Sequence, residues 1–511
     1  MNPLGLIRTE SYKKGMLLSV FFNFIAKGIL FLLTILIAKF FGRDIKTDIY
    51  FFIYGTMVLL SGFINTIDTV VLVPESMRIR EKQGPGAAAG FLNYFFRIYI
   101  ILGLLFVAVI YFFAVPIFGF FSRFSEPDII QFKNYFLLGS AYFFFMVLTN
   151  YINNILTSLK FFTIPMIISG INSCIVIAGI VLLQQRFDVL SILVAGVAAY
   201  SINLFILLWL MKKIADWKFF GNSSAVKKIV WGNISFAGLG QFATLAGSFL
   251  PLYLLSGFGQ GIISAMNYGK NIADIPNTLV TSQLTSVSGV QFNEQAARQD
   301  FPGMNESFAN TGKLLLFILV PLGCFLFVFA DAVVRLFYLR GSFTEEDVVS
   351  SAKFLQLLAV TIFSIGINSL VSRIFIAVQA VKQAFLYQLV LNALLMVAIW
   401  LFTKYHGAYG YPYAIILMNS INFIGMFFIC KKIAPQINFA TLLKYTGLLL
   451  LINVAISAGM HFAQPMLNAG IFGNCIIPFL VYLFILLLLN KIFHLNSDLA
   501  KAIQYVQKRI F

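Results

Sequence analysis

Charged side chains are scarce in this 511-residue sequence. Asp, Glu, Lys and Arg make up 11% of it, whereas hydrophobic residues make up 60% and the mean hydropathy is +0.90. A soluble domain carries about 25% charged and about 45–50% apolar residues. The composition therefore excludes a soluble globular protein, because too few polar side chains are present to cover its surface.

Cysteine and histidine are also scarce. The four cysteines have no CxxC spacing, which indicates free thiols buried in apolar runs rather than a disulfide or metal set. The three histidines lie far apart (His406, His461 and His494). Walker A, glycine-rich phosphate-loop and nucleophile-elbow patterns are missing from the sequence. We therefore expect no metal, no cofactor and no covalent catalysis, and we predict that the protein is not an enzyme.

Long hydrophobic runs fill most of the chain, each near the roughly 20 residues that a helix needs to cross a bilayer. Only a helix closes its backbone hydrogen bonds within such a segment. The pattern predicts an all-α polytopic membrane protein with about fourteen transmembrane helices. The predicted spans are residues 17–41, 49–73, 91–117, 132–155, 164–183, 189–211, 229–256, 262–288, 312–337, 348–377, 384–402, 410–430, 442–461 and 471–489.

The net charge of +17 comes from short loops between these spans. With both termini cytoplasmic, the inner loops and tails hold twenty Lys and Arg residues and the outer loops hold six. Cytoplasmic loops of membrane proteins carry such an excess. The basic charge therefore indicates membrane topology and does not indicate a nucleic-acid partner.

An internal repeat divides the chain. Residues 41–47 and 258–264 both fit F-G-x-x-I-x-[ST], at an offset of 217, and Asn172 and Asn392 lie in similar surroundings at an offset of 220. We predict two six-helix lobes, residues 1–211 and 229–430, joined by a cytoplasmic basic linker at 212–228. Residues 431–511 add two helices and a cytoplasmic tail. Parallel repeats are typical of transporters, whose site lies at the repeat interface near mid-membrane.

Several charges lie deep within predicted spans, where an ionised group costs about 2.5–3.5 kcal/mol. Lys27 and Arg373 are predicted to face protein or a water-filled cavity. Lys270 and Asp274 lie four residues apart on one helical face, where a structural ion pair and a substrate contact are both open. Because deep cations outnumber the deep carboxylate, the pattern favours an anionic cargo, such as the diphosphate of a lipid-linked precursor.

Other charges have structural explanations. Arg97 is near enough to the cytoplasmic end of its span to snorkel. Asp48 sits at the outer start of a span, where a helix N-cap formed by Thr47 or Asp48 explains it as well as a functional role does. Asp68 and the pair Asp331 and Arg335 are predicted near helix ends, in structural roles.

Residues 336–347 read LFYLRGSFTEED and concentrate one cation and three carboxylates. Gly341 permits a tight turn. Thr344 and Asp347 have the spacing of a capping box that starts the next helix. The turn and the capping box do not explain Arg340, which is a candidate gate contact at the outer surface.

The same stretch, with its L-F-x-x-R-G-x-F-T-x-x-D pattern, resembles the loop before span 10 of the MurJ/MviN lipid II flippases. This family belongs to the multidrug/oligosaccharidyl-lipid/polysaccharide exporter superfamily. Residues 38–52 (AKFFGRDIKTDIYFF), residues 268–276, and Arg373 with the following turn at 379–383 also fit the family. The resemblance covers nearly the whole chain.

The resemblance implies roles for single residues. Lys27 matches a functionally important arginine of span 1, Asp48 an aspartate at the start of span 2, and Arg373 a basic residue of span 10. The chain departs from the family at Leu33, Ser61 and Asn271, where arginines are expected. Lys270 lies one residue before Asn271. The implied substrate-binding residues are Lys27, Asp48, Lys270, Asn271 and Arg373, and the implied gate or structural residues are Arg97, Asp274 and Arg340.

The resemblance further implies two lobes in a V around a cationic cavity, with the last two spans forming a groove for a polyprenyl tail. Lipid II would cross the bacterial inner membrane by alternating access, driven by the membrane potential, which is worth about 2.3 kcal/mol per charge per 100 mV. Membrane lipids and cell-wall synthesis proteins are the other implied partners.

Three alternatives stay open. One is a flippase for another polyprenyl-diphosphate-linked glycan, of O-antigen or exopolysaccharide type. Another is a cation-coupled multidrug exporter, which needs a mid-membrane carboxylate in the first lobe. Asp68 is the one candidate, and it is predicted to lie too near the inner end of its span. The third is a non-transporting scaffold. Such a protein would not need Lys27 or Arg373, whose charges are costly inside the membrane.

Overall fold

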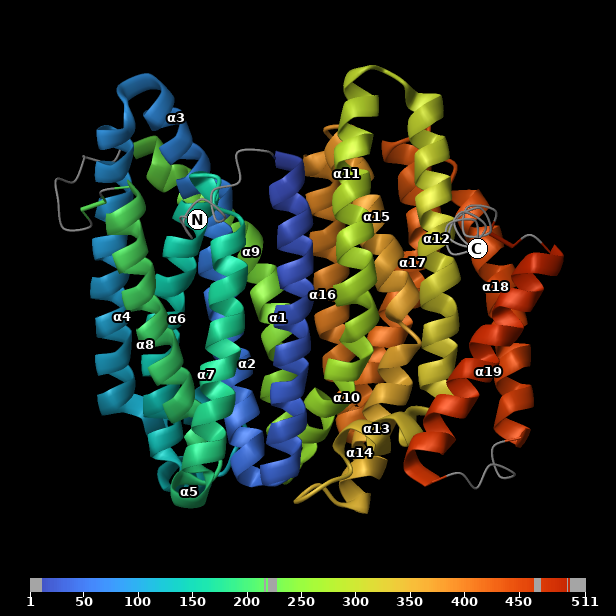
Figure 1. Cartoon of the computed structure of the whole chain (residues 1–511), viewed down its shortest axis with the longest axis horizontal. Coiled ribbons are helices and arrows are strands. Elements are labelled where there is room, and N and C mark those ends of the chain that lie inside the picture. The colour runs from blue at the N-terminus through green and yellow to red at the C-terminus, as the bar shows by residue number, and fades with distance from the viewer. Residues whose placement is uncertain (1–11, 216, 219–227, 464–469, 494, 497–511) are drawn as a thin grey trace, which may run out of the picture. The chain divides into compact units, whose positions relative to one another are not determined.

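The computed structural model describes residues 12–215, 217–218, 228–463, 470–493 and 495–496 of the chain (Figure 1). Every regular element in these residues is a helix. Most of the predicted linker and nearly all of the predicted C-terminal tail lie outside the described residues. The all-α class that the sequence predicts is confirmed.

Eleven helices in the described part of the chain are long and apolar enough to cross a membrane. The number becomes twelve when α14 (Glu345–Ala359) and α15 (Ile362–Ala377), which meet at 43°, count as one bent span. The apolar segment Lys382–Ile433 counts once, although it contains two helices, α16 and α17, that pack against each other. The predicted total of about fourteen is reached when these are taken separately and the more polar segment from α10 to α11 is added.

The chain divides into two compact units, Met1–Ser264 and Ala265–Phe511. The division falls after α9 (Lys228–Leu255), because α9 packs against α2 (Ile45–Ile67) of the first unit. The predicted lobe boundaries at residues 212–228 and 430, and the V-shaped arrangement, stay predictions.

The first unit packs its helices through small residues, as membrane helices do in the absence of a hydrophobic driving force between them. At Gly179, for example, an added Cβ would lie 2.4 Å from the Cβ of Ala195 on the neighbouring helix. The elements of this unit are α1 (Tyr12–Phe41), α2, the π-helical turn η2 (Asp68–Leu72), α3 (Val73–Gln83), α4 (Pro85–Phe121), α5 (Glu126–Gln131), α6 (Lys133–Ser158), α7 (Thr163–Phe187), α8 (Leu190–Ala215) and α9.

Two helices of the first unit are longer than the hydropathy predicts. The run α2–η2–α3 is continuous from Ile45 to Gln83, so Asp68 lies inside a helix and the prediction of a position near a helix end is wrong. Hydropathy alone predicts a loop for the charged last part of this helix, α3. The helix α4 kinks at Phe113, three residues before Pro116, because proline lacks the amide hydrogen and clashes with the preceding turn.

Two described residues of the predicted linker, Trp217 and Lys218, are anchored to α4 by a single side chain. The indole Nε1 of Trp217 donates to Asn93 Oδ1 at 3.0 Å, and Asn93 Nδ2 donates to the carbonyl of Lys218 at 2.8 Å. Both the indole and the amide are buried. The start of the linker is therefore part of the first unit's core.

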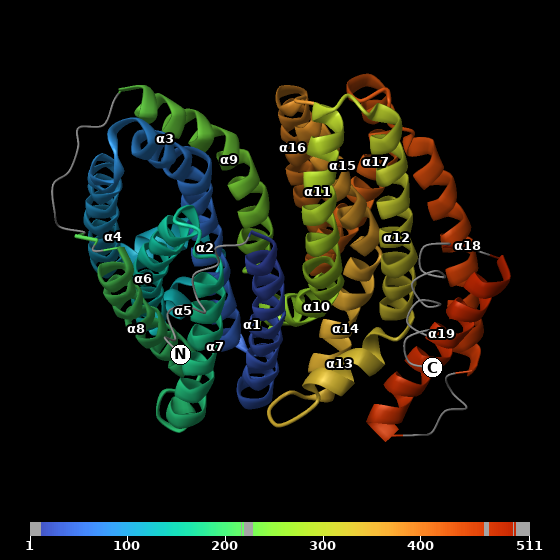
Figure 2. The same ribbon diagram turned by 45° about the horizontal axis from the view of Figure 1, so that its top comes forward.

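The second unit contains most of α10, whose first turn belongs to the first unit. In this unit α18 lies along α12, with α19 beside α18 (Figure 1 and Figure 2). The predicted spans 9 and 10 each form two helices. The elements are α10 (Ile262–Pro276), the π-helical turn η3 (Asn277–Thr281), α11 (Ser282–Ala297), α12 (Phe301–Val328), α13 (Ala330–Tyr338), α14, α15, α16 (Val381–His406), η4 (Gly407–Tyr409), α17 (Gly410–Ile433), α18 (Phe439–Ala463) and α19 (Gly470–Phe493).

The two copies of the internal repeat begin alike. Gly42 and Gly259 have φ of 59° and 96°, a left-handed conformation that glycine adopts without steric cost. A helix follows each, beginning at Ile45 and at Ile262. The π-helical turns further along do not correspond, because Asp68 and Asn277 differ by 209 residues (277 − 68) and not by the repeat offset of 217.

Gly269 is a point of close approach between α10 and α14. A Cβ at this position would lie 2.6 Å from the carbonyl oxygen of Ser351 and 2.7 Å from the amide nitrogen of Leu355. We expect Gly269→Ala to destabilise the protein by about 1–3 kcal/mol, because backbone atoms must shift to admit the methyl group. Thermal unfolding in detergent measures the effect. Gly447→Ala on α18 is the control, since no atom lies within 4 Å of that Cβ, and an equal loss in both variants would contradict the expectation.

Candidate functional site

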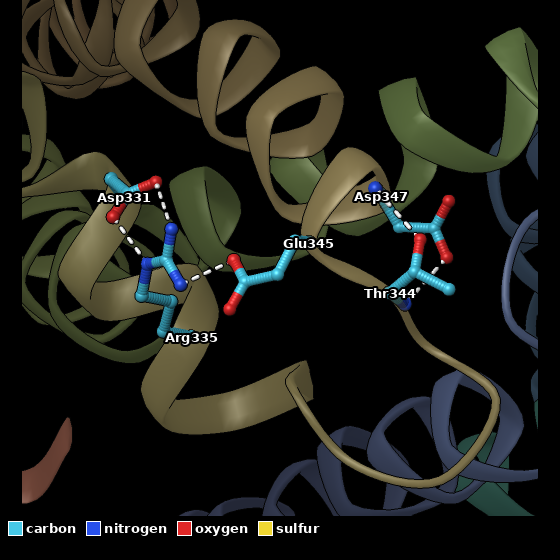
Figure 3. A network of polar contacts seen from close by, with 5 residues as sticks. All are labelled: Asp331, Arg335, Thr344, Glu345 and Asp347. Atoms are coloured by element: carbon cyan, nitrogen blue, oxygen red, sulfur yellow. Dashed lines mark hydrogen bonds and ion pairs between the residues drawn. The ribbon is translucent and has the colours of Figure 1, made fainter.

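The stretch 336–347 starts a helix as predicted (Figure 3). Gly341 has φ of 63° in the turn after α13. The backbone nitrogen of Thr344 donates to Asp347 Oδ2 at 2.8 Å, and the backbone nitrogen of Asp347 donates to Thr344 Oγ1 at 3.4 Å. This reciprocal pair confirms the capping box at the start of α14. Acidic residues in its first turn also complement the helix dipole.

Arg335 joins α13 to the start of α14 (Figure 3). Its Nε donates to Asp331 Oδ2 at 2.6 Å and its Nη1 pairs with Glu345. The hydrogen bond to Asp331 raises the pKa of the guanidinium above its ordinary value. All three side chains are partly exposed, and exposed pairs contribute only about 0–1 kcal/mol each. The structural role predicted for Asp331 and Arg335 fits this geometry.

Arg340, the candidate gate residue, is exposed in the turn after α13. Its Nη2 donates to the carbonyl oxygen of Leu336 at 2.6 Å. That carbonyl is one of those left without an amide partner at the end of the helix, so Arg340 caps α13. A gate contact for this side chain stays a prediction.

Asp48 is buried, with 1% of its surface exposed, and it binds the first turn of α10. The backbone nitrogen and the hydroxyl of Ser264 donate to Asp48 Oδ1 at 2.7 and 2.6 Å. The first amides of a helix have no partner within the helix and attract negative charge. Asp48 therefore anchors α10 from another helix, 216 residues away in sequence.

The prediction that Thr47 or Asp48 caps its own helix is wrong. The N-cap of α2 is Asp44, whose side chain accepts from the backbone nitrogen of Thr47 at 3.0 Å. In the second copy of the repeat, the position of Asp44 is occupied by Gly261, which has no side chain to cap α10. Asp48 supplies the missing cap. Aligning the two copies residue by residue reveals this gap in the sequence.

Gly261 is required where it stands for a second reason. Its φ is 81°, and an added Cβ would lie 2.5 Å from Cγ of Arg43. A side chain at this position would therefore strain the backbone and displace Arg43. Gly261 therefore both leaves α10 without a local cap and makes room for the side chain of Arg43.

Lys270 and Asp274 form the ion pair that their spacing predicts. Lys270 Nζ lies 2.5 Å from Asp274 Oδ2, and the two side chains are 44% and 47% exposed. The pair is therefore neutral overall but reachable from outside the second unit. Asn271, the next residue on α10, is half-buried. Whether any of the three contacts a substrate stays a prediction.

Arg373 and Lys27 are exposed on α15 and α1, one in each unit. The stem of Arg373 crosses α11 at Gly289, where a Cβ would lie 3.1 Å from Cδ of the arginine. Lys27 lies near the middle of α1, beside the buried Ala26. Among the described residues, neither cation forms an ion pair. Whether either cation binds an anion stays a prediction. A shared cavity for the two stays a prediction.

The remaining predicted site residue, Arg97, is half-buried on α4. All four cysteines are free, and Cys174 is exposed, whereas the sequence predicts buried thiols. In the part of the chain that the structure describes, no three His, Cys, Asp or Glu side chains gather as a metal site would require. Gly289 and Ser264 are the positioning residues that sequence reasoning missed.

A cavity of about 530 Å³ lies in the second unit, between α12, α14, α15 and α18. Its walls are mainly apolar, with few polar groups. The lining includes Val320, Cys324, Phe327, Gln356, Phe363, Val454, Ser457 and His461. The lining residues from the last two spans all belong to α18, so a groove formed by both of these spans stays a prediction.

The sequence of this chain is similar to known sequences of one family. The sequence profile of the family described as "Lipid II flippase MurJ" matches residues 37–481. A "Probable lipid II flippase MurJ" of Borreliella burgdorferi is 24% identical over 417 residues, covering 79% of this chain and 80% of that protein. One of Bdellovibrio bacteriovorus is 24% identical over 211 residues. That match covers 40% of this chain, and the chain spans only 39% of that relative.

Solved structures agree on the fold. "Lipid II flippase MurJ, inward closed conformation" has a TM-score of 0.78 at 20% identity, covering 95% of this chain and all of that one. A multidrug resistance MATE family transporter of the MOP superfamily, in an inward-facing conformation, has a TM-score of 0.61 at 15% identity, covering 88% and 96%. The profile match spans most of the sequence. Its fold also resembles that of the MATE transporter. The chain therefore belongs to the MurJ family of lipid II flippases, multi-pass membrane transporters rather than enzymes.

Proposed function

We propose that this protein moves lipid II, the undecaprenyl-diphosphate-linked peptidoglycan precursor, from the inner to the outer leaflet of the bacterial inner membrane by alternating access. The observation that supports this most is which of the predicted intramembrane charges have a partner within the protein. Asp48 and Asp274 are each engaged by a donor of the protein, whereas Lys27 and Arg373 have no carboxylate among the described residues. Lys27 and Arg373 are therefore available to a ligand, and their positive charge suits a diphosphate.

In this proposal Lys27 and Arg373 bind the diphosphate. Arg373 offers a planar fork for two phosphate oxygens, and Lys27 a point charge. Lys270 and Asn271 contribute hydrogen bonds to the same cargo, while Asp48 holds α10, the helix that carries both. Gly289 keeps the arginine stem against α11 and so limits the directions in which the guanidinium can reach.

The polyprenyl tail would enter the cavity of about 530 Å³ beside α18, which supplies the apolar contacts that an isoprenoid chain needs. Both termini would be cytoplasmic, as the distribution of loop charges predicts, and the membrane potential would drive the cycle. Cell-wall synthesis proteins would take over the exported precursor.

A flippase for another polyprenyl-diphosphate-linked glycan is the second candidate. It is favoured by two positions at which the family is expected to carry arginine. Leu33 is 8% exposed, and Ser61, also buried, accepts a hydrogen bond from Asn150 Nδ2 at 3.0 Å. Neither position could present a long cation to a substrate without repacking. The glycan part of the cargo would therefore meet different contacts.

Complementation tests the proposal. Cells depleted of their lipid II flippase are expected to grow when this protein is expressed, and lipid II is expected to become accessible at the outer leaflet. Arg373→Ala, expressed at the same level, is expected to fail because it leaves only one of the two cations that are proposed to bind the diphosphate. Absence of rescue by the parental protein, with expression in the membrane verified, would contradict lipid II as cargo.

A further inference from the structure

Two helices of the first unit carry matching stripes of uncharged residues, most of them polar. Both stripes have the spacing i, i+3, i+4, i+7, which places four residues on one face of a helix. The stripe on α2 and the start of η2 is Gly62, Asn65, Thr66 and Thr69, and the stripe on α6 is Asn150, Asn153, Asn154 and Thr157. The two helices pack against each other (Figure 2).

Two side-chain hydrogen bonds join these stripes. Asn150 Nδ2 donates to Ser61 Oγ at 3.0 Å, and Asn154 Nδ2 donates to Asn65 Oδ1 at 2.8 Å. Both bonds join residues 89 apart in sequence, and they lie about one helical turn from each other. The stripes are therefore side by side and form a single polar face, which we call the amide face.

Each asparagine of these bonds uses only part of its amide group. An asparagine side chain has two N–H donors and an oxygen that can accept twice. Asn150 Oδ1, Asn154 Oδ1 and Asn65 Nδ2 have no partner in the part of the chain that the structure describes, and none of these atoms is enclosed by protein. Asn154 Nδ2 also lies 3.5 Å from Asp68 Oδ2, but Asp68 is 1% exposed and does not present its charge on this face. The amide face thus offers both donors and acceptors and carries no charge.

The depth of the amide face in the membrane follows from a contact between α6 and α8. Thr149 Oγ1 donates to the carbonyl oxygen of Tyr200 at 3.5 Å, which sets these two residues at one level. Because α7 returns the chain between them, α6 and α8 run in the same direction. Asn154 and Phe205, each five residues further on, therefore also lie at one level. Phe205 is 68% exposed and apolar, as a lipid-facing side chain is, so Asn154 lies at the depth of the hydrocarbon.

A polar face at this depth is costly against lipid, because its donors and acceptors find no partner in hydrocarbon. Polar side chains within spans face protein or a water-filled cavity instead. The amide face is therefore suited to a polar ligand in water and not to the acyl chains of the bilayer.

The chemistry of the amide face distinguishes between the parts of the proposed cargo. The diphosphate and the carboxylates of a peptide are anionic and favour Arg or Lys, and the two stripes contain neither. The hydroxyl and acetamido groups of a sugar are neutral, and together they donate and accept, as the asparagine amides do. The glycan is thus the part of the cargo that matches this face.

We propose that the amide face binds the glycan of the transported lipid, with Asn65, Asn150 and Asn154 exchanging hydrogen bonds with sugar hydroxyl and acetamido groups. This inference rests on the proposed function, the transport of a lipid-linked glycan. It assigns the sugar to α2 and α6, apart from the cations proposed for the diphosphate. A site that hydrogen-bonds its substrate rejects an analogue that leaves its polar groups unpaired. The amide face therefore determines which glycan is accepted.

Saturation-transfer NMR of the purified full-length protein in lipid nanodiscs tests the amide face without transport. The probe is diacetylchitobiose, a neutral disaccharide that carries acetamido groups, at millimolar concentration. Its acetyl protons are expected to be saturated through the parental protein. Asn150→Leu should weaken binding about threefold to tenfold, the loss of one or two neutral hydrogen bonds. Absence of saturation with the parental protein, or saturation of an acidic tripeptide in place of the disaccharide, would overturn the proposal.

Ser61→Ala is the matched control. It removes the same bond between α2 and α6 but leaves the amide of Asn150 in place, so binding should stay at the parental level. An equal loss in both variants would assign the effect to the helix contact and refute the ligand contact. If Asn150→Leu does not fold, Thr66→Val takes its place, an isosteric change that removes one exposed hydroxyl. Unchanged binding by that variant would count against the amide face.

Complementation separates this inference from the proposed function. If the parental protein failed to replace a lipid II flippase but still bound the disaccharide, lipid II would be the wrong cargo and the amide face would stand. If the parental protein and Asn150→Leu rescued growth equally at matched expression, the proposed function would stand and the amide face would be refuted.

Discussion

Lys27→Ala is expected to lower transport at least tenfold while the protein remains folded and inserted. A hydrogen bond to a charged group contributes about 1.5–3 kcal/mol, and each 1.4 kcal/mol is a factor of about ten. Removing a charge from the middle of α1 does not impair insertion, because that charge is costly in the membrane. Lys27→Arg should retain transport, and Lys27→Glu should be the most defective, since it places like charge against the diphosphate.

The readout is accumulation of lipid-linked precursor in the inner leaflet of cells whose only flippase is the variant. Lys39→Ala is the matched control, because Lys39 lies on the same helix and its ammonium stacks over Phe40, 5.3 Å from the ring centroid. It should transport at the parental rate. Parental transport by both Lys27→Ala and Lys27→Glu, with expression matched, would remove Lys27 from the anion site.

Asp48→Ala is expected to lower the stability of the protein by about 3 kcal/mol, at the upper end of the ordinary range for one substitution. The change leaves the backbone amide and the hydroxyl of Ser264 without an acceptor, and Ser264 is fully buried. A buried donor that loses its partner costs about 1–3 kcal/mol. Asp48→Asn should cost less, because an amide oxygen can still accept.

Thermal unfolding in nanodiscs separates this anchoring role from a substrate contact. Asp44→Ala, which removes the local cap of α2, serves as the reference and should cost about 0.5–2 kcal/mol. If Asp48→Ala abolished transport with an unchanged Tm, Asp48 would be a substrate contact and the anchoring role would be wrong.

Local patterns predicted local structure well. The capping box of Thr344 and Asp347 and the ion pair of Lys270 and Asp274 join residues three or four apart, so their spacing alone determines that they meet. Gly341 also takes the left-handed turn that its place in the sequence predicts. The hydropathy also identified the class of the protein, because a bilayer imposes a minimum helix length.

Contacts between distant segments were not predictable in the same way. The role of Asp48 depends on Ser264, 216 residues away, and the stem of Arg373 rests on Gly289 of another helix. Asp68 was misplaced for a different reason. Hydropathy ends a span where charges begin, but α3 continues as a helix through Glu75, Arg78 and Lys82. The continuous helix from Ile45 to Gln83 thus extends beyond its apolar part into a charged part.

The cap that Asp48 provides to α10 has a consequence for any attempt to produce the two copies of the repeat separately. A fragment that begins at α9 contains Ser264 but not Asp48, so the backbone amide and the hydroxyl of Ser264 would lose their acceptor. The second copy is therefore incomplete at the start of α10 when it is separated from the first.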